Sequence, residues 1–212
     1  MKKDNANIFK EEKIFKDEDI NKFIDKLPFK LTDSQNEALD LILSDLKSNK
    51  KMNRLVLGDV GSGKTIISFI AMYASTLSGY QSVLMAPTEV LARQHFISAM
   101  NYFKDTNLCI EILVGSMTKK EKENVKDRLL NGDIDILIGT HTIIEETVVF
   151  YRLGLVIADE QHRFGVKQRE ILKSKGDIAD ALYMSATPIP RSYALTLYGD
   201  LDVSFITHKP GG

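Results

Sequence analysis

From residue 31 onwards, short apolar runs alternate along the chain with longer amphipathic stretches. The runs lie at residues 54–58, 82–87, 109–115, 135–141, 153–160, 181–187 and 203–207. Between them, apolar residues at helical spacing predict helices near 64–78, 89–103, 118–131, 166–174 and 190–198. Continuous apolar strands that are each followed by a helix are typical of a parallel sheet buried on both faces. The pattern therefore predicts an α/β fold with a mostly parallel sheet of about seven strands and helices on both faces.

The first residues of the chain follow a different pattern. Half of the first 30 residues are charged, and they contain no strand-like run. Within them, Ile20, Phe23, Ile24 and Leu27 stand at helical spacing ahead of Pro28, which is expected to end the helix. We expect residues 1–27 to form a charged arm or linker that docks through this apolar stripe, and residues 28–212 to form the main domain.

Local signals mark the ends of several predicted helices. Thr32 and Gln35 have the spacing of a capping box, and apolar residues follow at helical spacing up to Leu46. Gly79 and Gly132 stand where glycines commonly end helices. These signals support the predicted boundaries of the helices.

Composition limits the possible functions and the cellular compartment. The 212 residues carry 28 basic and 29 acidic side chains, for a net charge of -1, so binding to nucleic acid would depend on local clusters or backbone amides. The single cysteine, Cys109, excludes an internal disulfide and a cysteine-rich zinc site. No apolar run is long enough for a membrane span, and the N-terminus lacks the apolar core of a secretory signal. We therefore expect a cytoplasmic protein. Separately, we expect the side chains of His95 and His208 to be exposed to solvent.

The most specific signal is a glycine-rich segment between the first apolar run and the first long helix. It has the pattern G-x-x-x-x-G-K-[ST] and consists of Gly58, Asp59, Val60, Gly61, Ser62, Gly63, Lys64 and Thr65. Glycines let successive backbone N–H groups point at phosphate oxygens, and the positive end of the helix dipole adds to the attraction. Lys64 would reach the β- and γ-phosphates, and the Thr65 hydroxyl would bind Mg²⁺. The alternative is a glycine-rich turn without a ligand. The segment predicts a site for ATP and Mg²⁺.

A pair of carboxylates follows the apolar run at 153–158. We expect Asp159 to hold the Mg²⁺ from a strand neighbouring the phosphate loop, and Glu160 to orient and polarise the attacking water. Without the phosphate loop, such a pair would more often be a solvated strand end. No Asn-Lys-x-Asp sequence for reading guanine is present, which argues against a small GTPase.

Several strings together resemble the superfamily-two helicases and translocases. These are DEQH at 159–162, SAT at 185–187, APTEVLARQ at 86–94 and GTH at 139–141. The longer strings GDVGSGKT, MAPTEVLARQH, DEQHRFGVKQR and SATPIPRSYALTLYGDLDVS resemble the first motor domain of the RecG family of branched-DNA helicases. The resemblance covers roughly residues 27–212. Ser185 and Ser192 replace threonines that are common in that family, and both keep a hydroxyl.

The resemblance implies roles for further residues. Gln35 matches the family's adenine-reading glutamine, although its capping box could occupy the same side chain, and Phe29 could pack on the base or fill the core. Single-stranded DNA would contact two loops, through Pro87, Thr88, Arg93, Gly139, Thr140 and His141, although a Pro-Thr pair before a helix is also an ordinary cap. The nucleotide state would be coupled to movement through His162, Ser185, Thr187 and Arg191. The basic stretch at 163–169 would either lie near the DNA or form a solvated helix face.

The same resemblance implies the wider architecture. ATP would bind in a cleft between two RecA-like domains, and a wedge would separate the strands of stalled forks and Holliday junctions in the bacterial cytoplasm, at the nucleoid. We expect the chain to be one piece of a longer monomeric protein, without the second motor domain in cis and the wedge, and thus nearly inactive by itself. Three alternatives stay open: a transcription-repair coupling translocase, a regulatory P-loop ATPase that does not bind DNA, and a docking module with a vestigial phosphate loop.

Overall fold

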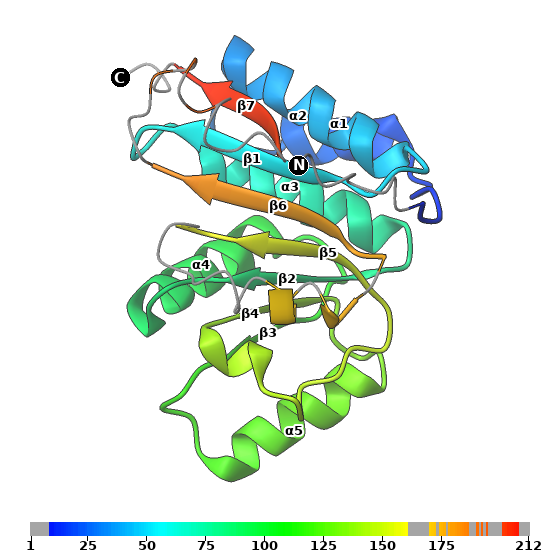
Figure 1. The fold of residues 1–212 in the computed structure, drawn as a ribbon, viewed down its shortest axis with the longest axis vertical. Helices are drawn as coiled ribbons and strands as arrows, with labels where there is room; N and C mark the ends of the chain where they lie inside the picture. Colours follow the sequence, from blue (N-terminus) through cyan, green and yellow to red (C-terminus); the bar gives the residue numbers. More distant parts are fainter. Residues whose placement is uncertain are drawn as a thin grey trace, which may run out of the picture.

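The computed structural model describes residues 9–160, 170–172, 174–176, 178–186, 190, 192, 194 and 201–207. Within this part of the chain, seven strands form one sheet in the order β3-β4-β2-β5-β6-β1-β7, and every pairing is parallel (Figure 1). The strands are β1 (Asn53–Gly58), β2 (Gln81–Met85), β3 (Ile110–Leu113), β4 (Ile136–Gly139), β5 (Leu153–Ala158), β6 (Asp180–Ser185) and β7 (Asp202–Ile206). Each of the seven predicted apolar runs overlaps one of these strands, with starts that agree to within one residue, so the predicted sheet is confirmed.

Helices cover both faces of the sheet. They are α1 (Asp17–Asp25), α2 (Asp33–Lys47), α3 (Lys64–Leu77), α4 (Glu89–Tyr102), α5 (Lys119–Leu130) and the short 3-10 helix η1 (His141–Ile144). Buried residues of α1 to α4 form one core with one face of the sheet, whereas α5 and η1 contribute to a second core on the opposite face. The prediction of helices on both faces is therefore confirmed.

The alternation of side chains along each strand explains the two cores. In β1, Val56 packs into the core beneath α1 to α4, whereas Leu55 and Leu57 pack into the core with α5. Successive side chains of a strand point to opposite faces, so a strand covered on both sides is mostly apolar along its whole length. This requirement accounts for the uninterrupted apolar runs in the sequence.

The predicted helix ends are largely correct. Thr32 and Gln35 form both hydrogen bonds of a capping box, and Gly79 and Gly132 have positive φ angles of 82° and 81° after α3 and α5. Of the two later predicted helices, 166–174 and 190–198, only parts lie among the described residues. Residues 170–172, 174, 192 and 194 are helical there.

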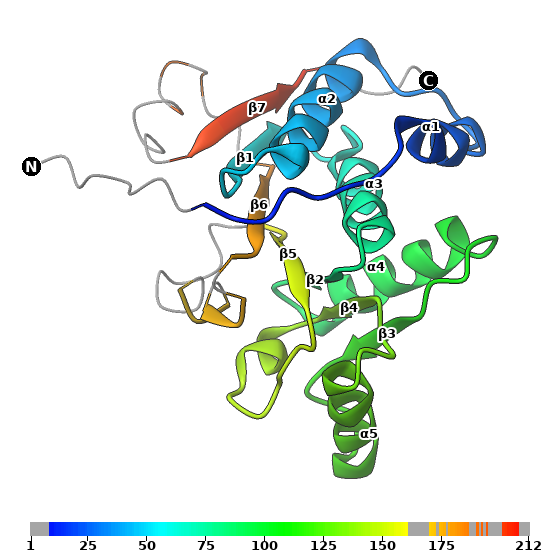
Figure 2. The ribbon, with the colours of Figure 1, turned by 90° about the vertical axis from the view of Figure 1, so that its right-hand side faces the viewer.

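The N-terminal arm docks through the predicted apolar stripe. Ile20 and Phe23 of α1 are buried, and the Phe23 ring stacks on Tyr73 and Phe103 with centroid distances of 4.8 and 5.3 Å. Before α1, the arm runs past β6 (Figure 2). The apolar docking of the arm is confirmed.

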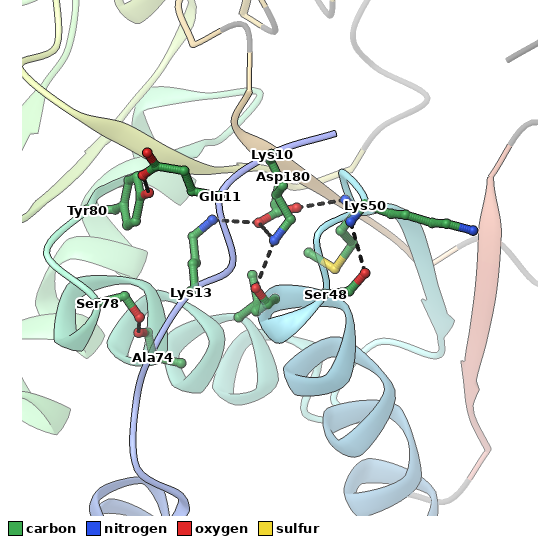
Figure 3. Close-up of polar contacts among 11 residues, drawn as sticks. Lys10, Glu11, Lys13, Ser48, Lys50, Ala74, Ser78, Tyr80 and Asp180 are labelled. Atoms are coloured by element: carbon green, nitrogen blue, oxygen red, sulfur yellow. Dashed lines mark hydrogen bonds and ion pairs between the residues drawn. The ribbon is translucent and has the colours of Figure 1, made fainter. Parts of the chain in front are cut away.

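The arm also has a polar anchor that the sequence analysis missed. Lys10 and Lys13 both point at Asp180, the first residue of β6, with Nζ–Oδ2 distances of 3.0 and 2.6 Å (Figure 3). Asp180 also accepts a hydrogen bond from the Met52 backbone at 2.7 Å, and its side chain is fully buried. Lysines in a charge-rich segment look solvated in sequence, and only the fold shows that these two are enclosed.

Candidate nucleotide-binding site

The glycine-rich loop joins β1 to α3 at the carboxyl edge of the sheet. Gly61 and Gly63 have positive φ angles of 79° and 84°, a backbone conformation that favours glycine. A Cβ atom on Gly63 would overlap the amide of Gln35, and one on Gly58 would lie 2.6 Å from the Ser62 hydroxyl. The spacing of glycines in the motif is therefore required by the path of the loop.

The ammonium group of Lys64 lies against the loop itself. Its Nζ donates to the carbonyl oxygens of Gly58 at 2.6 Å and Asp59 at 2.9 Å. Burial lowers the pKa of Lys64, although the negative charges of Asp159, Glu160 and Asp59 act in the opposite direction. Asp159 and Glu160 therefore lie close enough to Lys64 to influence its charge, at the same edge of the sheet.

Asp159 and Glu160 directly follow β5 at the same edge. The prediction that their strand neighbours the loop strand is wrong, because β6 lies between β1 and β5. Ser185 at the end of β6 pairs in register with Leu57 of β1, so it stands between the loop and the carboxylates. Doubly wound sheets bind ligands outside the carboxyl ends of their strands, where side chains from several strands converge.

Glu160 carries a further sign of function. Its φ angle is 52°, in the left-handed region that residues other than glycine rarely adopt. Such strain costs about 1–3 kcal/mol and clusters at active sites. No sequence pattern could have revealed this backbone conformation.

The prediction that His95 is solvated is wrong. His95 is buried on α4, and its Nε2 atom lies 2.7 Å from Oδ2 of Asp159. The two residues are 64 positions apart in the sequence, so only the fold brings them together. His95 is a site residue that the sequence analysis missed.

A cavity of about 470 Å³ lies beside the loop. It is lined by residues of the segment before α2, the loop, α3 and α4: Phe29, Gln35, Gly63, Thr65, Ile66, Gln94, His95, Ser98 and Tyr102. Gln35 is fully buried there, its Oε1 accepting from the Thr32 backbone at 2.9 Å and its Nε2 donating to the Ser62 carbonyl at 2.8 Å. The capping role of Gln35 is confirmed, and its contact with adenine stays a prediction.

The residues predicted to contact DNA lie on two adjacent loops. Thr88 caps α4 by accepting from the Leu91 backbone at 3.2 Å, as the plain structural interpretation predicted, and Pro87 precedes it. Arg93 forms an ion pair with Glu89 at 2.7 Å. The first of these contacts fixes the start of α4, and the ion pair lies within the first turns of the same helix.

The second loop begins at Gly139, which pairs in register with Met85 of β2. Thr140 is buried, whereas His141 is exposed. The pairing of β2 with β4 therefore brings both predicted DNA-contact loops to one edge, beside the nucleotide site. Their contact with DNA stays a prediction.

Some predicted residues cannot be placed. His162, Thr187, Arg191, His208 and the basic stretch at 163–169 lie outside the described residues. Among the residues that are described, no three or more histidine, cysteine, aspartate or glutamate side chains form a group that could hold a metal ion. No helix in the same part of the chain is both long and apolar enough to span a membrane.

A glycine loop between a strand and a helix, a lysine, and two carboxylates at the carboxyl edge of a parallel sheet define a RecA-like P-loop nucleotide-binding domain. The model of the DEAD/DEAH box helicase family matches residues 32–195. The chain belongs to the DEAD/DEAH box helicases.

Within this family the chain is similar to RecG. It is 53% identical to the ATP-dependent DNA helicase RecG of Streptococcus pneumoniae over 88% of the chain and 27% of that protein. The RecG proteins of Bacillus subtilis and Thermotoga maritima are 49% and 53% identical over 93% and 90% of the chain, and over 29% and 24% of their own lengths. The chain thus spans under a third of the length of these relatives.

Solved structures agree with this relationship. The structure of RecG bound to a three-way DNA junction superposes with a TM-score of 0.84 and 46% identity, covering 95% of this chain and 27% of that one. The UvsW helicase of bacteriophage T4, at 17% identity and a TM-score of 0.65 over 93% of this chain and 70% of its own, shares the fold.

Proposed function

We propose that this chain is the first motor domain of a RecG-type ATP-dependent DNA helicase that remodels branched DNA, such as stalled forks and Holliday junctions. The observation that carries the proposal is the convergence of Lys64, Asp159 and Glu160 at one edge of the sheet. The similarity to RecG supports DNA as the substrate of the whole protein.

Different residues of the chain bind the phosphates, bind Mg²⁺ and activate the attacking water in ATP hydrolysis. The backbone N–H groups of residues 59–64 and the ammonium group of Lys64 bind the phosphates. To do so, Lys64 gives up its hydrogen bonds to the Gly58 and Asp59 carbonyl oxygens and donates to phosphate oxygens instead. The hydroxyl of Thr65 and the carboxylate of Asp159 are oxygen ligands of the kind that Mg²⁺ prefers, and the ion would neutralise charge on the phosphates. Glu160 orients the attacking water and accepts its proton.

DNA contact is assigned to the two loops beside this site. Thr88 and Arg93, on the first loop and the helix after it, offer a hydroxyl and a guanidinium group for backbone phosphates. On the second loop the exposed His141 offers an imidazole, next to the buried Thr140. The pairing of β2 with β4 supports a single continuous contact surface. Gly139 ends β4, and its lack of a side chain lets the chain pass the Leu113 carbonyl closely.

The remaining roles follow from the family. Gln35 reads adenine, and His162, Ser185, Thr187 and Arg191 couple the nucleotide to movement of the domain. A second RecA-like domain in cis completes the ATP cleft, and its arginine would add a factor of about 10³–10⁵ in rate. We further propose that the whole protein acts as a monomer in the bacterial cytoplasm, at the nucleoid.

Nucleotide binding by this chain tests the first part of the proposal. We expect a fluorescent ATP analogue to bind the wild type in the presence of Mg²⁺, and Lys64→Ala to abolish the binding. Lys120→Ala, which removes the same side chain from an exposed position on α5, is the matched control and should bind as the wild type does. Equal binding by all three proteins would refute the nucleotide site.

Hydrolysis by the full-length protein that carries this chain tests the second part. We expect branched DNA to stimulate its ATPase activity and Glu160→Gln to lower kcat by about 10²–10⁴-fold. Glu160→Gln should still bind nucleotide. An ATPase activity that branched DNA leaves unchanged would instead favour a regulatory P-loop ATPase.

A further inference from the structure

One buried hydrogen bond joins the helix of a proposed DNA-contact loop to the proposed metal ligand of the nucleotide site. It links His95 Nε2 on α4 to Asp159 Oδ2 after β5, at 2.7 Å, and both side chains are about nine-tenths buried. We propose that His95 is a positioning residue that sets the orientation of the Asp159 carboxylate toward Mg²⁺ and thereby ties α4 to the nucleotide site. The inference rests on the proposed function, because it concerns the same site.

The chemistry of the pair fixes the direction of the hydrogen bond. An ionised carboxylate can only accept, so the hydrogen must be carried by Nε2 of the imidazole. A hydrogen bond at Oδ2 restricts rotation of the carboxylate and therefore also sets the direction of Oδ1. Metal-binding carboxylates are commonly oriented in this way by hydrogen bonds from neighbouring side chains.

Asp159 is held twice by the same structural unit. Its backbone N–H donates to the Met85 carbonyl at the end of β2 at 2.9 Å, while its side chain meets His95 on the following helix. Residues 86–88, which join β2 to α4, include the proposed DNA contacts Pro87 and Thr88. A shift of α4 relative to β5 would therefore turn the Asp159 side chain, while the Asp159 backbone stays hydrogen-bonded to Met85 of β2.

The surroundings of His95 place it at the nucleotide. His95 and Thr65, the second proposed magnesium ligand, line the same cavity beside the phosphate loop. His95 belongs to α4, lines the cavity and contacts Asp159. It can therefore connect the helix after a proposed DNA-contact loop to the proposed metal ligand.

Two substitutions separate positioning from simple packing. In His95→Gln, the amide nitrogen stands as many bonds from Cβ as Nε2 does, so the donor to Asp159 can be kept. In His95→Asn, the amide nitrogen corresponds to Nδ1 and cannot reach as far. Ile97→Ala, at an exposed position of the same helix, is the control for general effects on α4.

The first measurement is the Mg²⁺ concentration that half-saturates binding of the fluorescent ATP analogue to this chain. We expect His95→Asn to raise this concentration by about 10–100-fold, the usual effect of losing a group that orients a metal ligand. His95→Gln should stay near the wild type, and Ile97→Ala should not change it. Thermal unfolding of each variant, compared with the wild type, reports whether the fold is kept.

The second measurement needs no nucleotide. Long-range ¹H–¹⁵N spectra of the imidazole ring should show the hydrogen of His95 on Nε2, and Asp159→Asn should shift these ring signals. A hydrogen on Nδ1 and none on Nε2 in the wild type would overturn the inference. So would a defect in His95→Gln as large as that in His95→Asn.

The outcomes separate the inference from the proposed function. Normal nucleotide binding with an unchanged Mg²⁺ requirement in His95→Asn overturns the inference alone. A wild-type chain that binds no nucleotide overturns the proposed function, and the inference with it. The expected pattern, a defect in His95→Asn that His95→Gln repairs, supports both.

Discussion

We expect Asp180→Asn to lower the free energy of unfolding far more than the same substitution at an exposed aspartate. Asp180 is the counter-charge of Lys10 and Lys13, and the side chains of the three residues are 0%, 0% and 2% exposed. Asparagine has the same shape and can still accept the hydrogen bond from the Met52 backbone, which Asp180 receives at 2.7 Å. The substitution therefore removes the charge and leaves the packing.

The magnitude follows from the burial of the two lysines. Burial lowers the pKa of Lys13, and the charge of Asp180 opposes that shift, so the ammonium depends on this carboxylate. Removing one partner of a buried ion pair costs about 3–5 kcal/mol, because the remaining charge is left uncompensated. With an m value of about 3 kcal/mol/M, the midpoint of urea unfolding should fall by about 1–2 M. The Tm should fall by roughly 6–20 °C.

Urea denaturation of Asp180→Asn and Asp17→Asn provides a matched comparison. Asp17 forms an ion pair of the same length, 2.6 Å, with Lys47, but the two side chains are 70% and 39% exposed. Such a surface pair contributes about 0–1 kcal/mol, so Asp17→Asn should have little effect. Hydrogen exchange should also rise at residues 10–13 in Asp180→Asn.

Equal midpoints for Asp180→Asn and Asp17→Asn would refute this reasoning. That result would mean that the two lysines reach water and that the arm is not anchored through β6. A large loss of stability without faster exchange in the arm would place the effect of Asp180 in the sheet alone.

Two further perturbations test local features. Gly63→Ala should lower the Tm and the affinity for nucleotide more than Gly61→Ala, because both residues have positive φ angles but only a Cβ on Gly63 would overlap Gln35. Equal effects in thermal unfolding and analogue binding would show that backbone strain alone matters. Hydrogen bonds from Thr118 hold the pKa of Glu121 below its usual value, so the contribution of Glu121 to stability is present above that usual value and lost as pH falls through the lowered pKa. The stability difference between wild type and Glu121→Ala should therefore shrink in acid unfolding, and a constant difference would contradict this.

Sequence analysis was most successful where the signal is local. The phosphate loop follows from the order of Gly58, Gly63, Lys64 and Thr65, because loop, strand and helix are contiguous there. Apolar runs located the strands, since a strand buried on both faces has no polar side to interrupt it. The capping box of α2 was likewise visible, because its two partners are three residues apart.

Contacts between distant residues were missed or predicted wrongly. His95 was expected in water because a lone histidine on a helix gives no local sign of its partner, 64 residues later. For Lys10 and Lys13, in the charged arm, no partner was predicted, because Asp180 lies 167 positions beyond Lys13. The strand of Asp159 was expected beside β1, but the order of strands in a parallel sheet depends on how the crossovers pack.

The sequence by itself determined the class of fold and marked the glycine-rich loop and the two carboxylates as candidates, because periodicity and motif spacing depend on residues that are close together in the chain. Only the tertiary structure decided that β6 separates loop and carboxylates, that Glu160 adopts a left-handed backbone, and that His95 holds Asp159. The physical reason is that burial and pairing of polar groups depend on which surfaces meet when the chain folds, and those surfaces come from segments far apart in the chain.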